Sequence, residues 1–331
     1  LKPKTTMTYL ENSKQYTGSD LENIFFRPML TGESAQDLGV RVLYNMPQPT
    51  HVQLWDGQRN ILQKFTSAGW AGGKAATKYE KTVNLNRVKA ELGFSAANYF
   101  SMVYEKVSSL VNTHMDDLSG TELEQAETAL FKQALAENIR VTMWIGDTSA
   151  ASGYNTFDGL LKRINGLVDD DGVYNFAYQA AALEDPAYAV ELFDKLWTGA
   201  DPRIPGLKAD DRLAYFVSSD IYRLYEKYLD AKGADAAYAD AMNGRRTLAY
   251  HGIPVVDVRL GSYLGATSFR QSFVMLTDRR NLVLAVNTAD MPGNEVRMWY
   301  NPDEMENRQR AVFMAGTQIL DEALISFAYK Q

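Results

Sequence analysis

The chain has 331 residues, of which 46% are hydrophobic and 23% are charged, and such a composition is ordinary for a globular protein. It has 34 basic and 41 acidic residues, and this acidic balance argues against a protein that grips nucleic acid through a basic surface. The absence of cysteine excludes disulfides and zinc–thiolate sites, and three scattered histidines disfavour a histidine-rich metal centre.

The first segment, residues 1–48, is polar and irregular, and Pro28 and Pro47 interrupt it. Phe25 and Phe26 form a short apolar stretch inside it that needs another surface to bury against. We expect either an arm that lies on a neighbouring subunit or a loop that lies on its own domain.

From residue 51 to about 87 the pattern changes to alternation of apolar and polar residues, which predicts strands. An Asp-Gly turn at 56–57 separates two apolar stretches, and a glycine-rich segment at 69–74 is typical of a flexible tip. We expect a long β arm that rests on another surface, because isolated hairpins are marginally stable.

Two helices are expected next. Residues 95–111 carry apolar side chains at helical spacing, and residues 119–144 form a clearer case. The second begins with a capping box, Ser119 to Glu122, and keeps a single apolar face over its length. It is suited to lie as a spine against a sheet.

The middle of the chain predicts a helix over 187–197, a loop bracketed by Pro202 and Pro205, and a helix over 210–231. Asp210 would cap this last helix, and Asp211 would lie beside it. Its inward face would consist of Leu213, Val217, Ile221, Leu224 and Tyr228. A further short helix would end at 243–244, where Asn-Gly is a stop signal.

The region 250–286 contains two apolar runs, 272–277 and 282–286, separated by a polar turn, and this pattern predicts a β-hairpin. A strand over 248–258 would contain a half-buried His251. Three more strands are expected at 295–300, 309–315 and 323–329.

No segment carries a convincing set of catalytic, cofactor-binding or metal-binding residues. Consecutive aspartates at 169–171 lack the spacing of a calcium loop, and the segment ending at Lys74 lacks the spacing and hydroxyl of a phosphate loop. No apolar run is long enough for a transmembrane helix, so no membrane partner is expected. We therefore predict a protein that is not an enzyme and holds no cofactor.

Taken in this order, the segments resemble the major capsid protein family of tailed double-stranded DNA bacteriophages. The resemblance rests on Trp-Ile-Gly-Asp at 144–147, Phe-Asp-Gly-Leu at 157–160, the Tyr-His-Gly-Ile-Pro-Val stretch at 250–255 and the polar turn at 278–281. It covers nearly the whole chain, as an order of elements with short local motifs. The chain does not begin with methionine, which fits a removed N-terminal segment, a family habit, and a trimmed chain equally.

This resemblance implies an α+β fold of the phage major capsid protein type. Such a fold has a spine helix over an antiparallel sheet, a projecting β-hairpin called the E-loop, and a mixed α/β axial domain. The implied parts are an N-terminal arm over 1–50, an E-loop over 51–89, a peripheral domain over 90–154, an axial domain over 155–285 and strands returning to the peripheral domain over 286–331.

The resemblance also implies a structural function. Subunits would self-assemble as hexamers and pentamers into the icosahedral shell of a virion, built in the host bacterial cytoplasm. The shell would enclose DNA without reading its sequence and would contact portal, decoration or scaffold proteins. The arm and the E-loop would lie on neighbouring subunits, and the candidate contact residues there are Phe25, Phe26, Trp55, Trp70, Lys74 and Tyr79.

Two other readings stay open. An encapsulin-like nanocompartment shell has the same fold but holds an enzyme cargo instead of DNA. A soluble α+β ligand-binding protein or enzyme belongs to a different class and needs a convergent polar pocket, which the sequence does not indicate.

Overall fold

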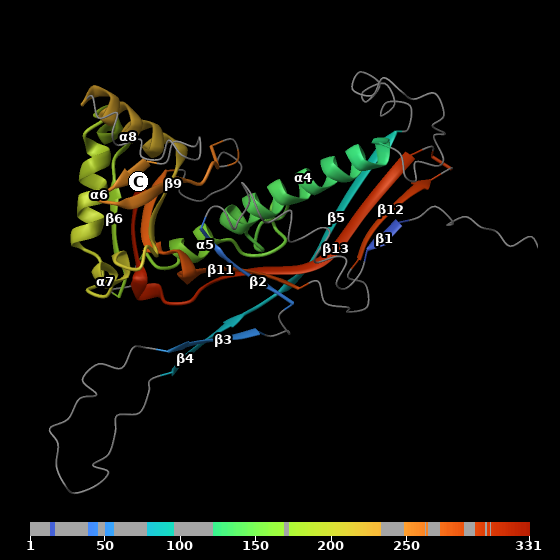
Figure 1. Ribbon diagram of the computed structural model, residues 1–331, viewed down its shortest axis with the longest axis horizontal. Coiled ribbons are helices and arrows are strands. Elements are labelled where there is room, and N and C mark those ends of the chain that lie inside the picture. The colour runs from blue at the N-terminus through green and yellow to red at the C-terminus, as the bar shows by residue number, and fades with distance from the viewer. Residues whose placement is uncertain are drawn as a thin grey trace, which may run out of the picture.

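The computed structural model describes twelve stretches of the chain: residues 14–16, 39–45, 50–55, 78–95, 122–168, 172–232, 248–261, 263, 272–287, 295–301, 303–304 and 306–331. Their strands form two six-stranded sheets and one two-stranded ribbon. Figure 1 shows the two sheets at different ends of an elongated molecule, with the ribbon extending away from them.

The first sheet centres on one long strand, β13, which pairs antiparallel with β5 and with both β11 and β12. A 24-residue helix, α4, lies along this sheet (Figure 1). The strands run in the order β1-β12-β13-β11-β2, with β5 also on β13. Their bounds are β1 Lys14–Tyr16, β2 Arg41–Tyr44, β5 Asn86–Ser95, β11 Leu282–Asn287, β12 Glu295–Asn301 and β13 Glu306–Ile319, and α4 spans Glu122–Ile145.

The second sheet runs in the order β6-β14-β10-β7-β9-β8 and is covered on both faces. Helices α6 and α8 cover one face, and α5 with the end of α4 covers the other. The parallel strands β7 and β9 flank α8 in the chain. Bounds are β6 Tyr174–Tyr178, β7 Leu213–Val217, β8 Leu248–Tyr250, β9 Ile253–Asp257, β10 Phe273–Asp278, β14 Ile325–Lys330, α5 Leu160–Asn165, α6 Tyr188–Thr198, α7 Ile204–Lys208 and α8 Ser219–Ala231.

Helix α4 joins the two sheets into one core. Phe131, Leu135 and Ile139 recur every four residues and are buried against the first sheet, as an amphipathic helix requires. Near its end the helix is buried all round, and Trp144 packs against Phe216 and Phe273 of the second sheet, with ring centroids 5.7 and 6.1 Å apart. The expected spine helix is confirmed.

The ribbon consists of β3, Thr50–Trp55, and β4, Lys78–Val83, which pair antiparallel. Its base is buried: Val52, Val83 and Leu85 pack on Val283 and Ala285 of β11. These β11 side chains point away from the main core, where their neighbours Leu282, Leu284 and Val286 lie. The long β arm expected from residue 51 onward therefore starts from the second face of the first sheet.

The hairpin expected between 272–277 and 282–286 is wrong, although both strands exist. Strand β10 pairs with β14 and β7, whereas β11 pairs with β13 and β2. The 3₁₀ turn between them, η5 (Arg279–Asn281), carries the chain from the second sheet to the first. Both strands are buried along their whole length because each lies inside a sheet covered on both faces.

The helix expected over 210–231 is also wrong in its first half. Residues 213–217 form the buried strand β7, and the helix α8 starts only after Ser218. Asp210 and Asp211 lie exposed in the turn before β7, so they cap no helix. Pro205, expected in a loop, lies inside the short helix α7.

His251 lies in a turn, where a strand was expected. Tyr250 pairs with Ile253, and the two residues between them, His251 and Gly252, have φ of 50° and 78°. Positive φ at both central positions is the signature of a type I′ hairpin, which glycine at the second position favours. His251 is exposed.

The expected helix at 187–197 is confirmed by α6, and the last three expected strands are confirmed by β12, β13 and β14. The last of these, β14, joins the second sheet. Ser95, where a helix was expected to begin, is the last residue of β5, and the rest of that expected helix, 96–111, lies outside the described residues. The expected helix ending at 243–244, the apolar stretch at 61–65 and the aspartates at 169–171 also lie outside them.

Candidate functional site

A metal cluster, a membrane-spanning helix or a polar pocket among the described residues would each point to a specific function. Within those stretches, no three aspartate, glutamate or histidine side chains gather as a metal site would require. No helix in the same stretches has the length and apolar character needed to cross a membrane. A small pocket beside α5, lined by Leu161, Ile164 and Phe273 among others, is almost wholly apolar. The features with the most defined geometry are those that fix the shape of the chain.

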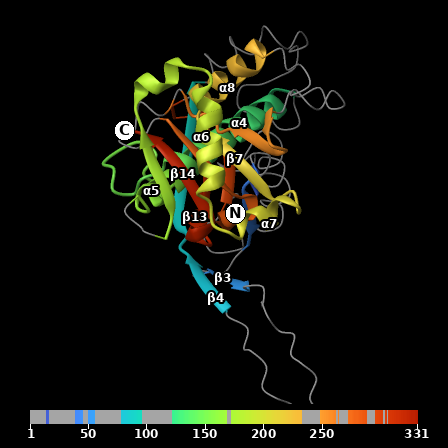
Figure 2. The same ribbon diagram turned by 90° about the vertical axis from the view of Figure 1, so that its left-hand side faces the viewer.

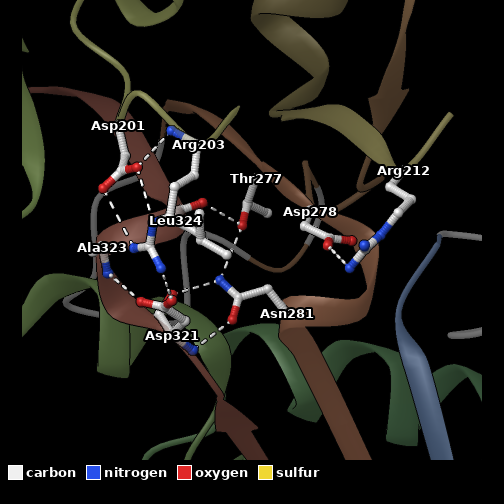
Figure 3. Close-up of polar contacts among 9 residues, drawn as sticks. All are labelled: Asp201, Arg203, Arg212, Thr277, Asp278, Asn281, Asp321, Ala323 and Leu324. Carbon is white, nitrogen blue, oxygen red and sulfur yellow. Dashed lines mark hydrogen bonds and ion pairs between the residues drawn. The ribbon is translucent and has the colours of Figure 1, made fainter. Parts of the chain in front are cut away.

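The junction between the two sheets is the first of these (Figure 3). The chain crosses between the sheets through η5, and it crosses again through Asp321 and η6 (Glu322–Leu324), between β13 and β14. Asn281 joins the two crossings: its side-chain amide donates to the Asp321 carbonyl at 2.8 Å and accepts from the Asp321 N–H at 2.7 Å. It is 4% exposed, so these bonds are shielded from water.

Further polar contacts surround this amide pair. The buried Thr277 hydroxyl donates to the Leu324 carbonyl at 2.8 Å and accepts from Asn281 at 3.1 Å. Arg203 bridges Asp201 and Asp321, and its hydrogen bond to Asp201, together with the contact to Asp321, raises the pKa of its guanidinium. The two crossings are therefore bonded to each other and to the α6–α7 connection, as Figure 3 shows.

A second ion pair closes the other side of the junction. Arg212 pairs with Asp278, whose side chain is only 3% exposed, immediately before η5 (Figure 3). The Asp278 carboxylate also accepts the N–H of Arg280 at 2.9 Å and so caps the 3₁₀ turn. A buried carboxylate needs partners of this kind to offset its desolvation.

Two glycines allow the end of α4 to meet the segment before α5. The N–H of Gly159 donates to the carbonyl of Gly146 at 2.8 Å. A Cβ on Gly146 would lie 2.2 Å from the Phe157 carbonyl oxygen, and one on Gly159 would lie 2.5 Å from the Gly146 nitrogen. The Trp-Ile-Gly-Asp and Phe-Asp-Gly-Leu motifs are thus the two halves of one close backbone contact.

Lys162 of α5 secures this contact by bridging Asp147 and Asp158 at 2.7 and 2.6 Å. Its hydrogen bond lowers the pKa of Asp147. Burial alone raises the pKa of Asp158, but hydrogen bonds from Lys162 and Thr148 bring it below its ordinary value. Burial likewise lowers the pKa of Lys162, and the two carboxylates raise it overall.

The base of the ribbon is fixed at a third close contact. A Cβ on Gly316 of β13 would lie 2.1 Å from the Asn84 carbonyl oxygen, so the chain between β4 and β5 crosses directly over β13 at this glycine. Gln318 donates to the Thr82 carbonyl at 2.9 Å. Lys81 pairs with Glu322 of η6 at 2.7 Å, which links the ribbon to the junction.

Of the six candidate contact residues, two have described backbone in the ribbon. Trp55 pairs with Lys78 and Tyr79 pairs with Leu54 at the outer end of β3 and β4. Phe25, Phe26, Trp70 and Lys74 lie outside the described residues. All six stay predictions.

Sequence patterns did not single out Asn281 or Gly316, and Asn281 is visible in the sequence only as the last residue of the polar turn at 278–281.

No family model matches the chain, and no curated protein matches it in sequence. Solved capsid structures do resemble it over nearly its full length. A chain of the capsid of the native GTA particle is 14% identical with a TM-score of 0.53, and the match covers 91% of each chain. A chain of the satellite phage P4 procapsid, a structure that includes size determination (Sid) protein, is 11% identical with a TM-score of 0.54, covering 90% of this chain and 88% of that one.

The capsid of the empty GTA particle gives a similar result, with 14% identity, a TM-score of 0.52 and coverage of 90% and 96%. At such identities the likeness establishes the fold. The α+β fold expected from the sequence, that of phage capsid proteins, is confirmed.

Proposed function

We propose that the chain is the subunit of a self-assembling capsid shell of the tailed-phage type. The observation that carries the proposal is the likeness to capsid chains, which covers about nine-tenths of this chain and of each capsid chain. In this role the protein is structural and holds no cofactor.

The ribbon supports a proposal for how subunits contact one another. A two-stranded hairpin is marginally stable alone, and within the described residues only its base packs on its own subunit. We therefore place its outer part, with Trp55, Trp70, Lys74 and Tyr79, on a neighbouring subunit. Phe25 and Phe26 of the arm would bury there in the same way. Contacts of this heterologous kind close into rings when the rotation closes, which gives hexamers and pentamers.

The proposed domains follow the two sheets. The first sheet and α4 form the peripheral domain, and the second sheet with α6 and α8 forms the axial domain. The arm spans 1–50, the E-loop 51–89, the peripheral domain 90–154 and the axial domain 155–285, except that β11 (Leu282–Asn287) pairs in the first sheet and so belongs with the peripheral domain. The return strands begin at 286, and β14 re-enters the axial sheet.

The net charge of −7 supports a shell that encloses DNA without adhering to it. Such a shell belongs in a virion, assembles in the host cytoplasm, and meets a portal and decoration or scaffold proteins.

The test compares the full chain with a variant in which residues 56–77 are replaced by Asn-Gly. Trp55 and Lys78 are paired, so a two-residue type I′ turn joins them and the buried base is kept. By negative-stain microscopy and sedimentation velocity, the full chain should form capsomers or shells. The shortened variant should melt at the same temperature and fail to close shells.

If the full chain stays a 37.1 kDa monomer at every concentration, the proposal is refuted. A measurement on particles isolated from producing cells distinguishes a phage capsid from an encapsulin-like shell. The ratio of absorbance at 260 and 280 nm is high when the particles contain DNA and low when they contain a protein cargo.

A further inference from the structure

Strand β6 forms one edge of the second sheet, and it lacks the usual protection of an edge strand. It pairs with β14 on one side, and no strand among the described residues pairs with its other side. Edge strands are normally protected by lysine, other charges or proline. Residues 172–183, which contain β6, have neither a charged residue nor a proline, and the 3₁₀ turn that follows the strand ends at Glu184.

An exposed aromatic residue stands on this strand. Tyr174 is 40% exposed and is one of two large hydrophobic side chains exposed among the described residues. Phe176 lies beside it at a ring-centroid distance of 6.0 Å, in an edge-to-face arrangement. Lys195 covers the Phe176 ring from α6 at 5.8 Å.

A glycine holds the Tyr174 ring in place. A Cβ on Gly199, at the end of α6, would lie 2.3 to 2.5 Å from atoms of that ring. Gly199 has φ of −85° and ψ of −3°, a conformation that any residue adopts, so the backbone does not require glycine there. The space for the ring explains this glycine. Tyr174 is thus an exposed aromatic side chain whose ring position is fixed in advance by the space at Gly199. Aromatic side chains that are held in place before binding are typical of interface anchors.

The surface continues into the 3₁₀ turn η2, Ala180–Glu184. Ala177 of β6 and Ala180 and Ala181 of the turn are exposed along the same edge segment, and Ala177 lies on the face of the strand opposite Tyr174 and Phe176. Aromatic enrichment and depletion of charge characterise the cores of protein interfaces. We call Tyr174, Phe176, Ala177, Ala180 and Ala181 the β6 edge surface.

We propose that the β6 edge surface binds a second copy of this chain, side by side in a ring; the inference rests on the proposed function. The five residues of this surface carry no charge, and Lys195 beside them is paired with Glu191 at 2.6 Å, which disfavours a nucleic acid as the partner. In Figure 2, β14 lies to the left and β7 to the right. The strand order of the second sheet therefore puts its two edge strands, β6 and β8, on opposite sides of the axial domain. A ring formed by head-to-tail contacts uses two different surfaces on opposite sides in this way.

The first test uses two glycine substitutions. In Gly199→Ala the new methyl group displaces the exposed Tyr174 ring towards solvent while the backbone conformation is kept. Gly206→Ala in α7 is the matched control, because a Cβ there meets nothing within 4 Å. We expect Gly199→Ala to raise the concentration needed for assembly about tenfold, as loss of an interface anchor does, with an unchanged melting temperature. Equal assembly of Gly199→Ala and Gly206→Ala would overturn the inference and leave the proposed function intact.

The second test does not depend on shell closure. A benzophenone amino acid replaces Tyr174, and irradiation should give a covalent homodimer whose cross-linked peptides come from two copies. If the wild-type chain forms no shells or capsomers, the proposed function fails, and the homodimer still decides whether this surface binds a second copy. Absence of any homodimer at the highest soluble concentration would refute the inference.

Discussion

Replacing Asn281 with alanine measures how firmly the junction holds the two sheets in one arrangement. The substitution removes three side-chain hydrogen bonds of 2.7 to 3.1 Å at a site that is 4% exposed. It leaves the N–H and the carbonyl of Asp321 without these partners. At about 1 kcal/mol for each bond, the free energy of unfolding should fall by about 3 kcal/mol.

For 331 residues, an unfolding entropy of ~2.1 cal/mol/K per residue gives ~0.7 kcal/mol/K, so the melting temperature should fall by about 4 °C. Thermal and urea denaturation measure this effect. Asn155→Ala is the control, because Asn155 is exposed and its side chain makes one 3.3 Å bond. A loss below about 0.5 kcal/mol for Asn281→Ala, the range of ordinary surface substitutions, would refute the argument that this amide holds the crossings together.

Two further substitutions test the other contacts. Gly316→Ala should lower the free energy of unfolding by about 1–3 kcal/mol in urea denaturation, because its methyl group would overlap the Asn84 carbonyl. Gly261→Ala should be neutral, because its Cβ would come no closer than 4.0 Å to another segment, at the Ser219 hydroxyl. Lys162→Met should cost about 1 kcal/mol at neutral pH, against no change for the exposed Lys227→Met. The two aspartates that Lys162 bridges have pKa values below 3.8, and its own lies above 10.5, so the cost should shrink below about pH 4 and above about pH 10.5. A cost independent of pH would contradict the ion-pair explanation.

The elements that the sequence predicts best are those with one buried face. Helix α4 has a single buried apolar stripe through Phe131, Leu135 and Ile139, and its period is visible in the sequence. Strands β10 and β11 are buried on both faces, so their apolar runs carry no period and do not say which sheet each joins. A short polar turn between two such runs is compatible with a hairpin and equally with a crossing between sheets.

The wrong helix over 210–231 has a related cause. Leu213 and Val217 fit a helical spacing with Ile221, but they also alternate along a strand with Tyr215 between them. The local signal that separates the two readings is Ser218, which has extended backbone and precedes the first turn of α8. Aromatic and β-branched residues at 213–217 favour the strand.

The candidate sites depend on tertiary approach, which single-sequence patterns do not report. Gly146, Gly159, Gly199 and Gly316 have no positive φ, so no turn pattern demands them. Each is glycine because another segment, 11 to 232 residues away in the chain, lies against its Cα. Spacing rules recognise a glycine that bends the backbone, but not one that makes room for a neighbour.

These close contacts have a common consequence for assembly. The end of α4, the two crossings and the base of the ribbon are each fixed by backbone contact or buried hydrogen bonds, and Lys81 with Glu322 joins the ribbon base to the junction. A subunit tied together in this way has little freedom to bend between its two sheets. In the proposed shell, adaptation to five or six neighbours would then fall to the outer ribbon and the arm. The Asn-Gly shortening of the ribbon should therefore impair shell closure while leaving the β6 edge contact, and its photo-cross-link, intact.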